Sequence, residues 1–404
     1  MSEFGDPSDH ALILDPARIP LSLYIHVPWC LKKCPYCDFN SHTLPKEELM
    51  NAPFDEYVNA LIKDIDSQLD LVQGRSIHSI FIGGGTPSLL PTAEFGRLFT
   101  HLKNVLAFDK NIEITLEANP ATLEHAPFEE YLSLGINRLS VGVQSFDNQA
   151  LSVLGRVHDC DDAVRAILQA KKAGFTRINA DLMHGLPMQT PKLAVNDIQM
   201  ALQAGATHVS WYQLTIEPNT AFYRTPPDLP NEDVLEEIEK QGRATLLQAG
   251  FTNYEISAWV GRDDTACQHN LNYWQFGDYL AIGAGAHGKV TLLDHASHPN
   301  GVYRFAKTRL PRDYLSYEYA PKMVDFHKID EIDLPFEFMM NALRLASGVS
   351  VDTFEERTGL LISTIDNELL PLQHQGFMVF DPNLIAPTKM GFRYANHLMQ
   401  AFLP

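Results

Sequence analysis

The stretch LSLYIHVPWCLKKCPYC, residues 21–37, decides how the rest of the chain is interpreted. Its first seven residues are apolar and β-branched in near alternation, which predicts a strand that ends at Pro28. Three cysteines follow in the spacing C-x3-C-x2-C, namely Cys30, Cys34 and Cys37. Because they lie on a turning loop directly after a strand, this loop is where chemistry is to be expected.

We call these three residues the cysteine triad. Three closely spaced thiolates can hold three irons of a [4Fe–4S] cluster, which leaves the fourth iron without a protein ligand. An open coordination position marks a metal site that takes part in chemistry, and here it could bind the amino and carboxylate groups of S-adenosylmethionine. The alternatives are a structural zinc with His26 or His42 as fourth ligand, and unligated buried thiols.

The composition limits the classes of function. The 404 residues carry 31 Lys and Arg against 50 Asp and Glu, a formal net charge of −19, which disfavours general nucleic-acid binding. No apolar run approaches the roughly 20 residues of a membrane helix. The first residues, MSEFGDPSDH, are acidic where a secretory signal would be basic, so we expect a soluble, cytoplasmic protein. Peripheral contact with a membrane stays open.

Strand-like and helix-like patterns alternate along the first 260 residues. Strands are expected at 21–27, 77–82, 112–116, 139–143, 178–183, 209–214 and 254–260. Helices are expected between them, at 54–71, 95–106, 161–173, 193–204 and 228–250. About six strand–helix units are too few for an eightfold barrel, so the pattern predicts an α/β fold, either an incomplete open barrel or a doubly wound sheet. In both, the site lies at the carboxyl ends of the strands.

The chain divides into four predicted segments. Residues 1–18 form a flexible leader, 19–290 the barrel, 291–333 an irregular connection with several prolines, and 334–404 a small C-terminal domain. That domain is expected to be α-helical and winged-helix-like, with helices at 336–345, 351–358 and 361–373 and a β-wing formed by 376–380 and 384–387. Since its third helix is acidic to neutral, we expect it to be structural or to cover a substrate rather than to bind DNA.

Short polar or glycine-rich motifs stand at the predicted strand ends. They are GGGTP at 83–87, EANP at 117–120, GVQSF at 142–146 and DLMHGLP at 181–187. Successive glycines would let backbone N–H groups approach a ligand, Glu117 and Asp181 could accept from ribose hydroxyls or an amino group, and Arg156 could bind a carboxylate. A tight turn and surface ion pairs are the structural alternatives.

This series of motifs, together with the cysteine triad, resembles the radical S-adenosylmethionine superfamily over residues 21 to about 290, and within it the branch of anaerobic coproporphyrinogen III oxidases. The resemblance implies an incomplete (β/α)6 barrel, a [4Fe–4S] cluster and S-adenosylmethionine, whose sulfonium is cleaved by an electron from the reduced cluster. It implies the following S-adenosylmethionine contacts: Tyr24, Gly84, Gly85, Thr86, Glu117, Gln144, Arg156 and Asp181.

Two departures favour one part of that branch. Dedicated oxidases have a further cysteine two places after the third, where this chain has Phe39. Its segment HNLNYW, residues 269–274, resembles the H-N-x-x-Y-W signature of the haem chaperones in the coproporphyrinogen-III-oxidase-like family. That resemblance implies a chaperone that binds haem, delivers it to haem-accepting, respiratory enzymes and dimerises through the cluster.

Within the signature, His269 is the candidate haem ligand, because imidazole is a good axial ligand for iron. A buried structural role for His269 is the alternative, and His287 is a further candidate near the cofactor. Cys267 could be a haem-reactive group or a plain buried thiol. The alternative function is radical decarboxylation of coproporphyrinogen III in porphyrin biosynthesis, so whether the chain is an enzyme stays open, and no catalytic residue is assigned.

Overall fold

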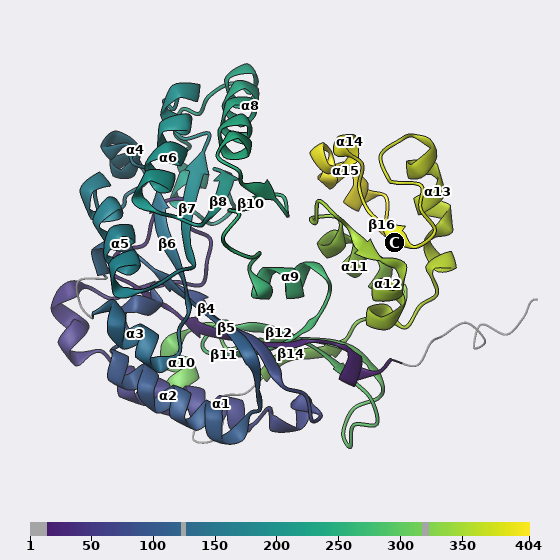
Figure 1. Cartoon of the computed structure of the whole chain (residues 1–404). Coiled ribbons are helices and arrows are strands. Elements are labelled where there is room, and N and C mark those ends of the chain that lie inside the picture. The colour runs from purple at the N-terminus through teal and green to yellow at the C-terminus, as the bar shows by residue number, and fades with distance from the viewer. Residues whose placement is uncertain (1–13, 123–126, 317–322) are drawn as a thin grey trace, which may run out of the picture.

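The computed structural model describes residues 14–122, 127–316 and 323–404 of the chain. A twelve-stranded sheet forms the body of the molecule (Figure 1). In spatial order its strands are β14 (Met323–Lys328), β13 (Gly301–Lys307), β12 (His287–Leu292), β11 (Asp278–Ile282), β1 (Leu21–Val27), β4 (Ile77–Gly84), β5 (Phe108–Ala118), β6 (Arg138–Gln144), β7 (Ile178–His184), β8 (His208–Gln213), β10 (Ala258–Val260) and β9 (Thr252–Asn253).

The central strands make an open barrel rather than a doubly wound sheet. Strands β1, β4, β5, β6, β7 and β8 are adjacent, parallel and in chain order. A doubly wound sheet reverses its strand order at the first strand, and no such reversal occurs among these six. The sheet continues past β1 through the parallel strand β11 and the antiparallel strands β12 to β14. The predicted incomplete six-unit barrel is therefore confirmed.

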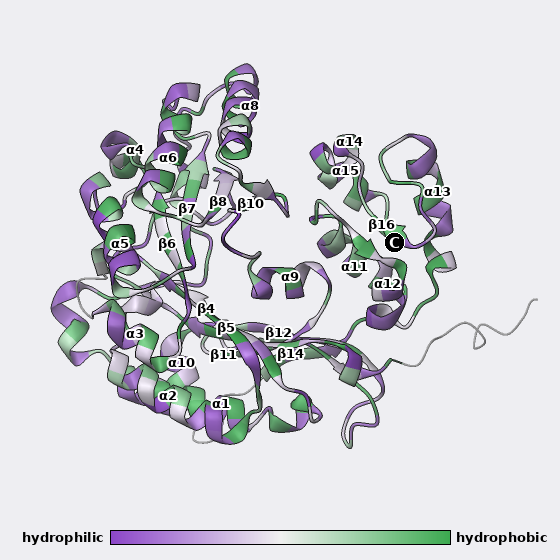
Figure 2. Ribbon diagram, in the orientation of Figure 1, coloured by the Kyte–Doolittle hydropathy of each residue, from purple (hydrophilic) through white to green (hydrophobic). Residues whose placement is uncertain are grey.

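Helices cover the outer face of the curved sheet (Figure 1). They are α1 (Phe54–Asp66), α2 (Thr92–Val105), α3 (Phe128–Leu134), α4 (Asn148–Val153), α5 (Cys160–Ala173), α6 (Pro191–Ala204), α7 (Ala221–Arg224) and α8 (Glu232–Gln248). Each long helix turns an apolar stripe to the strands, as α1 does with Tyr57, Leu61 and Ile65, all fully buried. Figure 2 shows hydrophobic residues concentrated between these two layers and hydrophilic ones outside. Helix α9 (Gln268–Trp274) instead lies inside the curve of the sheet (Figure 1).

A second hydrophobic core holds the C-terminal part together, with Phe338 and Phe354 in edge-to-face contact at 5.1 Å. Its elements are α11 (Leu334–Ala342), β15 (Val349–Ser350), α12 (Val351–Thr358), α13 (Asp366–His374), β16 (Leu384–Ile385), α14 (Lys389–Arg393) and α15 (Ala395–Gln400). The expected wing is only partly right. Residues 384–385 pair with 349–350, and the 376–380 segment pairs with 386–388 through the bridge from Met378 to Pro387 and two flanking backbone hydrogen bonds.

The predicted irregular connection is wrong where it contains regular elements. Residues 291–333 contain the end of β12, all of β13 and β14, and α10 (Pro311–Leu315). The prolines that suggested irregularity lie between elements or at a first helical position, where proline costs nothing: Pro299 is in the loop between β12 and β13, and Pro311 starts α10. Pro321 lies outside the described residues.

Smaller differences occur at other boundaries. Only residues 14–18 of the predicted leader are described, and Pro16–Arg18 form a 3-10 turn, so this part is ordered. The strand expected at 254–260 shrinks to β10, paired antiparallel with β8. The helix expected at 361–373 begins with a 3-10 turn, Ile362–Ile365. No helix in the described part of the chain is both long and apolar enough to cross a membrane.

Candidate functional site

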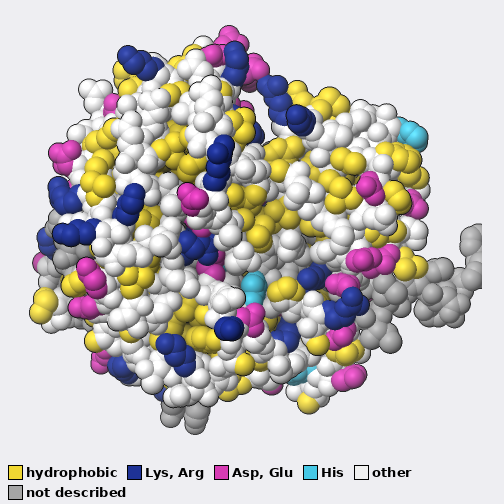
Figure 3. Space-filling view, viewed as in Figure 1, with side chains coloured by type: hydrophobic (Ala, Val, Ile, Leu, Met, Phe, Trp, Pro, Cys, Tyr) yellow, Lys and Arg dark blue, Asp and Glu magenta, His cyan; other side chains and the backbone are white. Residues whose placement is uncertain are grey.

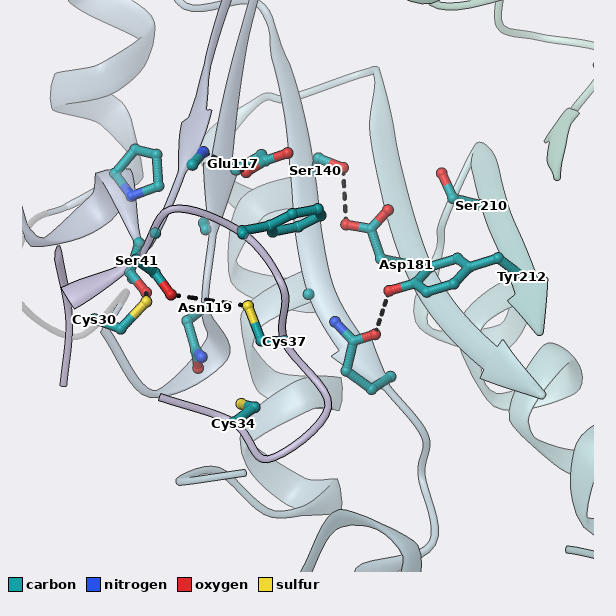
Figure 4. A pocket seen from close by; sticks show the side chains of 18 of the residues that line it. Cys30, Cys34, Cys37, Ser41, Glu117, Asn119, Ser140, Asp181, Ser210 and Tyr212 are labelled. Atoms are coloured by element: carbon teal, nitrogen blue, oxygen red, sulfur yellow. Dashed lines mark hydrogen bonds between the residues drawn. The ribbon is translucent and has the colours of Figure 1, made fainter. Parts of the chain in front are cut away.

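A cavity of about 490 Å³ opens where the parallel strands end, within the roughly 300–1,000 Å³ typical of small-ligand sites (Figure 4). Side chains from the triad loop form one wall and strand ends form the other. The predicted residues that line it are Cys30, Cys34, Cys37, Gly84, Gly85, Thr86, Glu117, Gln144, Arg156 and Asp181. Strand-end and loop positions far apart in sequence are thus brought to one space, as the barrel fold requires.

The cysteine triad lies on a loop between β2 (Trp29–Cys30) and β3 (His42–Thr43), and its three thiols are free and half-buried. Two donors approach the sulfurs: Thr86 Oγ1 lies 3.4 Å from Cys30 Sγ, and an Arg156 guanidinium nitrogen lies 3.6 Å from Cys34 Sγ. Burial raises the pKa of the Cys30 thiol, so the free site favours thiols, whereas metal binding or nearby cations favour thiolates. Three unpaired soft donors on one loop fit the iron–sulfur cluster.

The zinc alternative with His26 as fourth ligand fits less well because this ring is already engaged. Its Nδ1 is 3.0 Å from the Tyr24 hydroxyl, and its Nε2 is 2.9 Å from the carbonyl oxygen of Asn40. Within the described ranges, no group of three or more His, Cys, Asp or Glu side chains surrounds a single ion. In a [4Fe–4S] cluster each cysteine binds a different iron, so its thiolates do not converge on one point.

The glycines at the end of β4 allow close packing. A Cβ on Gly84, whose φ is +113°, would lie 2.6 Å from the His26 ring, and one on Gly85 would lie 2.5 Å from the carbonyl oxygen of Trp29. The Gly84, Gly85 and Thr86 N–H groups donate within the protein, to Glu117 Oε2, Val27 O and Trp29 O. These N–H groups are therefore engaged within the protein, and the glycines let β4 pass under the triad loop; contact of Gly84, Gly85 and Thr86 with S-adenosylmethionine stays a prediction.

Two carboxyl groups form an acidic wall of the cavity. Asp181 accepts from Ser140 Oγ at 2.9 Å and from Asn179 Nδ2 at 2.8 Å (Figure 4 shows the first bond). Burial, and next the charge of Asp181, raise the pKa of Glu117 to about 8, and burial raises the pKa of Asp181 as well. This wall favours a ligand that brings a positive charge or hydroxyl donors.

Gln144 and Arg156 line the same cavity. Gln144 accepts a 2.7 Å hydrogen bond from the Tyr212 hydroxyl, and Arg156 donates to Gly142 O at 2.6 Å (Figure 4 shows the former). Arg156 Nε is buried and makes no hydrogen bond within the described part of the chain, so a donor is left for a ligand. Tyr212, at the end of β8, was missed from sequence, although its strand-end position is the signal that would have found it.

Tyr24 does not line this cavity. It lines an adjoining cavity of about 550 Å³ together with His26, Tyr273 and His287, and the two cavities share Glu117 in their walls. Its ring stacks on Phe81 at 6.4 Å. Tyr24 thus faces the adjoining cavity, and its contact with S-adenosylmethionine stays a prediction.

His269 lines neither of these two cavities. Its ring is 4% exposed, stacked on Phe81 at 4.8 Å and on Tyr24 at 6.1 Å, and burial lowers its pKa to about 3. On the same helix, Trp274 does line the main cavity. Cys267 is a buried thiol that donates to Glu113 at 3.4 Å, in agreement with the plainer of the two interpretations.

Comparison with known proteins gives concordant results. The description "Radical SAM superfamily" matches residues 24–201, and "HemN C-terminal domain" matches residues 329–394. "Heme chaperone HemW" of Haemophilus influenzae is 45% identical over 393 residues, covering 96% of this chain and 99% of that protein. The protein of the same name from Escherichia coli is 44% identical over 384 residues, covering 95% and 98%.

Among solved structures, the chain resembles coproporphyrinogen III oxidase (HemN) from Escherichia coli, described as a radical SAM enzyme. The TM-score is 0.78 and the sequence identity 23%, with 96% of this chain and 91% of that chain covered. At this identity the likeness shows a shared fold.

Proposed function

The chain belongs to the HemW family of haem chaperones within the radical S-adenosylmethionine superfamily, and from this we propose that it binds haem and delivers it to haem-dependent enzymes. The observation that carries the proposal is identity of 44–45% along nearly the whole length of two chaperones. The oxidase shares the fold at 23% identity, which does not transfer its activity. The sequence-based family assignment is confirmed.

We also propose that the main cavity binds the cofactors. We assign the cysteine triad to three irons of a [4Fe–4S] cluster and the cavity beside it to S-adenosylmethionine; together, when bound, they supply one-electron reductive chemistry. Arg156, with its unpaired Nε, is placed for the methionine carboxylate. The acidic wall is placed for the amino group and ribose hydroxyls, and Glu117 gives up its proton when a cation arrives.

The haem site is a separate proposal. His269 remains the predicted ligand, and because it is buried, side chains around it must move before iron can reach a ring nitrogen. His287, which lines the adjoining cavity and is exposed, is the second candidate and needs no such movement. Delivery to respiratory enzymes, dimerisation through the cluster and a cytoplasmic location stay predictions.

The test is haem transfer. Protein with a reconstituted cluster is loaded with haem, freed of excess haem, and mixed with the apo form of a haem-dependent enzyme, whose recovered activity is followed over time. We expect recovery beyond that given by the same concentration of free haem in the presence of a scavenging apoprotein. Recovery no greater than with free haem would refute delivery.

The ligand assignment is tested in the same preparation. Replacing His269 with Ala should weaken haem binding and change the Soret spectrum, whereas His287→Ala should leave both unchanged. The opposite pattern would move the iron ligand to His287, and no effect of either would place it elsewhere.

A further inference from the structure

One end of the main cavity is lined by residues other than the cysteine triad and the acidic wall. It is lined there by Glu255, Trp274 and Arg344, from the β9–β10 loop, α9 and the segment after α11. Each carries a buried polar atom without a hydrogen bond among the described residues: Glu255 Oε2, Trp274 Nε1 and Arg344 Nε. Buried polar atoms are usually paired, so three unpaired ones at one cavity end indicate a missing partner.

The ion pair between Arg344 and Glu255 is longer than a hydrogen bond. Arg344 lies 3.6 Å from Glu255 Oε2, beyond hydrogen-bond distance, while its guanidinium stacks 4.3 Å above the Trp274 ring. Glu255 Oε1 instead accepts from the Ser257 N–H at 3.1 Å. Burial raises the pKa of Glu255, against the effect of Arg344, so the carboxylate compensates the arginine charge only in part. Two donors, a guanidinium and an indole N–H, are thus left for an acceptor.

Backbone hydrogen bonds join the segment that carries Glu255 to the segment that carries Arg344. Ile256 N donates to Arg344 O at 3.1 Å, and Ala346 N donates to Tyr254 O at 3.0 Å. These bonds join the barrel to the segment that follows α11 and hold the backbone of Arg344 beside that of Glu255. Figure 3 shows hydrophobic side chains gathered along the seam between the barrel and the C-terminal helices, an apolar surface beside the polar atoms.

The two donors and their apolar surroundings indicate the class of ligand that this end of the cavity binds. A carboxylate accepts from a guanidinium and an indole N–H together, and the aromatic and apolar surroundings suit a flat hydrophobic body attached to it. The two carboxyl groups of the acidic wall disfavour a carboxylate beside them, whereas here the one carboxyl group, that of Glu255, has the Arg344 cation beside it. We propose that Arg344 and Trp274 form a carboxylate subsite that holds a propionate of the haem; this rests on the proposed haem-binding function.

A purely structural role is the competing explanation, because Arg344 and Glu255 also join the two parts of the fold. Arg393 provides the matched control: it forms an ion pair with Glu236 of α8 at 2.7 Å, and both side chains are exposed. Its loss removes a second link between the C-terminal helices and the barrel without touching the cavity.

The experiment compares haem with haem dimethyl ester, whose propionates carry no charge, by titration of the Soret band in the same buffer and detergent. The wild type should bind haem at least about tenfold more tightly than the ester, as expected for a hydrogen bond to a charged group. Arg344→Gln should remove most of that preference by weakening haem binding and leaving ester binding unchanged. Trp274→Phe should reduce the preference in part, and Arg393→Gln should keep it.

If Arg344→Gln weakens the binding of haem and of the ester equally, Arg344 has a structural role and the subsite is overturned. The subsite is also overturned if Arg344→Gln keeps the wild-type preference for haem over the ester. A wild type that binds haem and ester equally would also overturn it while leaving haem binding intact. A wild type that binds neither ligand would overturn the proposed function itself, and the subsite with it.

Discussion

Replacing Glu117 with Gln should stabilise the cofactor-free protein at alkaline pH and at the same time weaken S-adenosylmethionine binding. In the folded state the pKa of Glu117 is about 8, against an ordinary value of 4.5, because the carboxyl group is buried beside Asp181. An acid whose folded pKa is raised binds its proton more tightly in the folded state. Stability from this group is therefore complete below pH 4.5 and is lost as the pH rises towards 8.

The size of the effect follows from that rise in pKa. At about 1.4 kcal/mol per pH unit, the rise from 4.5 to about 8 allows at most about 5 kcal/mol. The side chain lines a cavity that water can enter, and screening by water leads us to expect about half, ~2 kcal/mol. Glutamine does not titrate, so Glu117→Gln does not lose stability through ionisation of a buried carboxyl group.

The assay is denaturant unfolding of the cofactor-free protein at pH 5.5 and 8.5. The advantage of Glu117→Gln over the wild type should grow by about 2 kcal/mol between these values. Exposed Glu129 on α3 supplies the control, and Glu129→Gln should follow the wild type at both pH values. In the reconstituted protein, Glu117→Gln should bind S-adenosylmethionine at least about tenfold more weakly, since a bond to a charged group is lost.

A difference between variant and wild type that is the same at pH 5.5 and 8.5 would refute the reasoning, because it would show that Glu117 ionises freely in the folded protein. Unchanged S-adenosylmethionine affinity would remove Glu117 from the binding site even if the pH dependence held.

Three further changes test other parts of the structure. Lys307→Met leaves Asp64 buried without its cation and should lower the unfolding free energy by about 3–5 kcal/mol. Lys240→Met, at an exposed ion pair, is the control and should change it by less than about 0.5 kcal/mol. An equally small effect of Lys307→Met would contradict the buried ion pair. Gly85→Ala should lower the iron and sulfide content per chain by displacing the triad loop, and Gly96→Ala on α2, whose Cβ has room, should not. Alanine at all three positions of the cysteine triad should abolish absorbance near 400 nm and leave the far-UV circular dichroism unchanged; a retained cluster would refute the ligand assignment.

The barrel was predictable because its strands are continuous apolar runs. Buried parallel strands need no polar face, so β1, β6 and β7 were located to within one residue at each end. The polar motifs that follow these strands then had to meet at one edge of the sheet, which is why most of the cavity lining could be assigned from the sequence.

What the sequence could not show depends on contacts distant along the chain. Lys307 looks like a surface residue, but it is fully buried in β13, where it forms an ion pair with Asp64 of α1. The signature histidine, His269, gave no sign that aromatic rings would enclose it. Arg344 belongs to the cavity only through backbone bonds to residues 254–256, about 90 positions earlier.

The central claim is that this barrel carries haem rather than decarboxylating coproporphyrinogen III. The most direct test divides one anaerobically reconstituted preparation: one half is titrated with haem, and the other receives coproporphyrinogen III, S-adenosylmethionine and a low-potential reductant. We predict saturable haem binding in the first half and no protoporphyrinogen in the second. Protoporphyrinogen formed in step with 5′-deoxyadenosine would contradict the account and make this chain an oxidase.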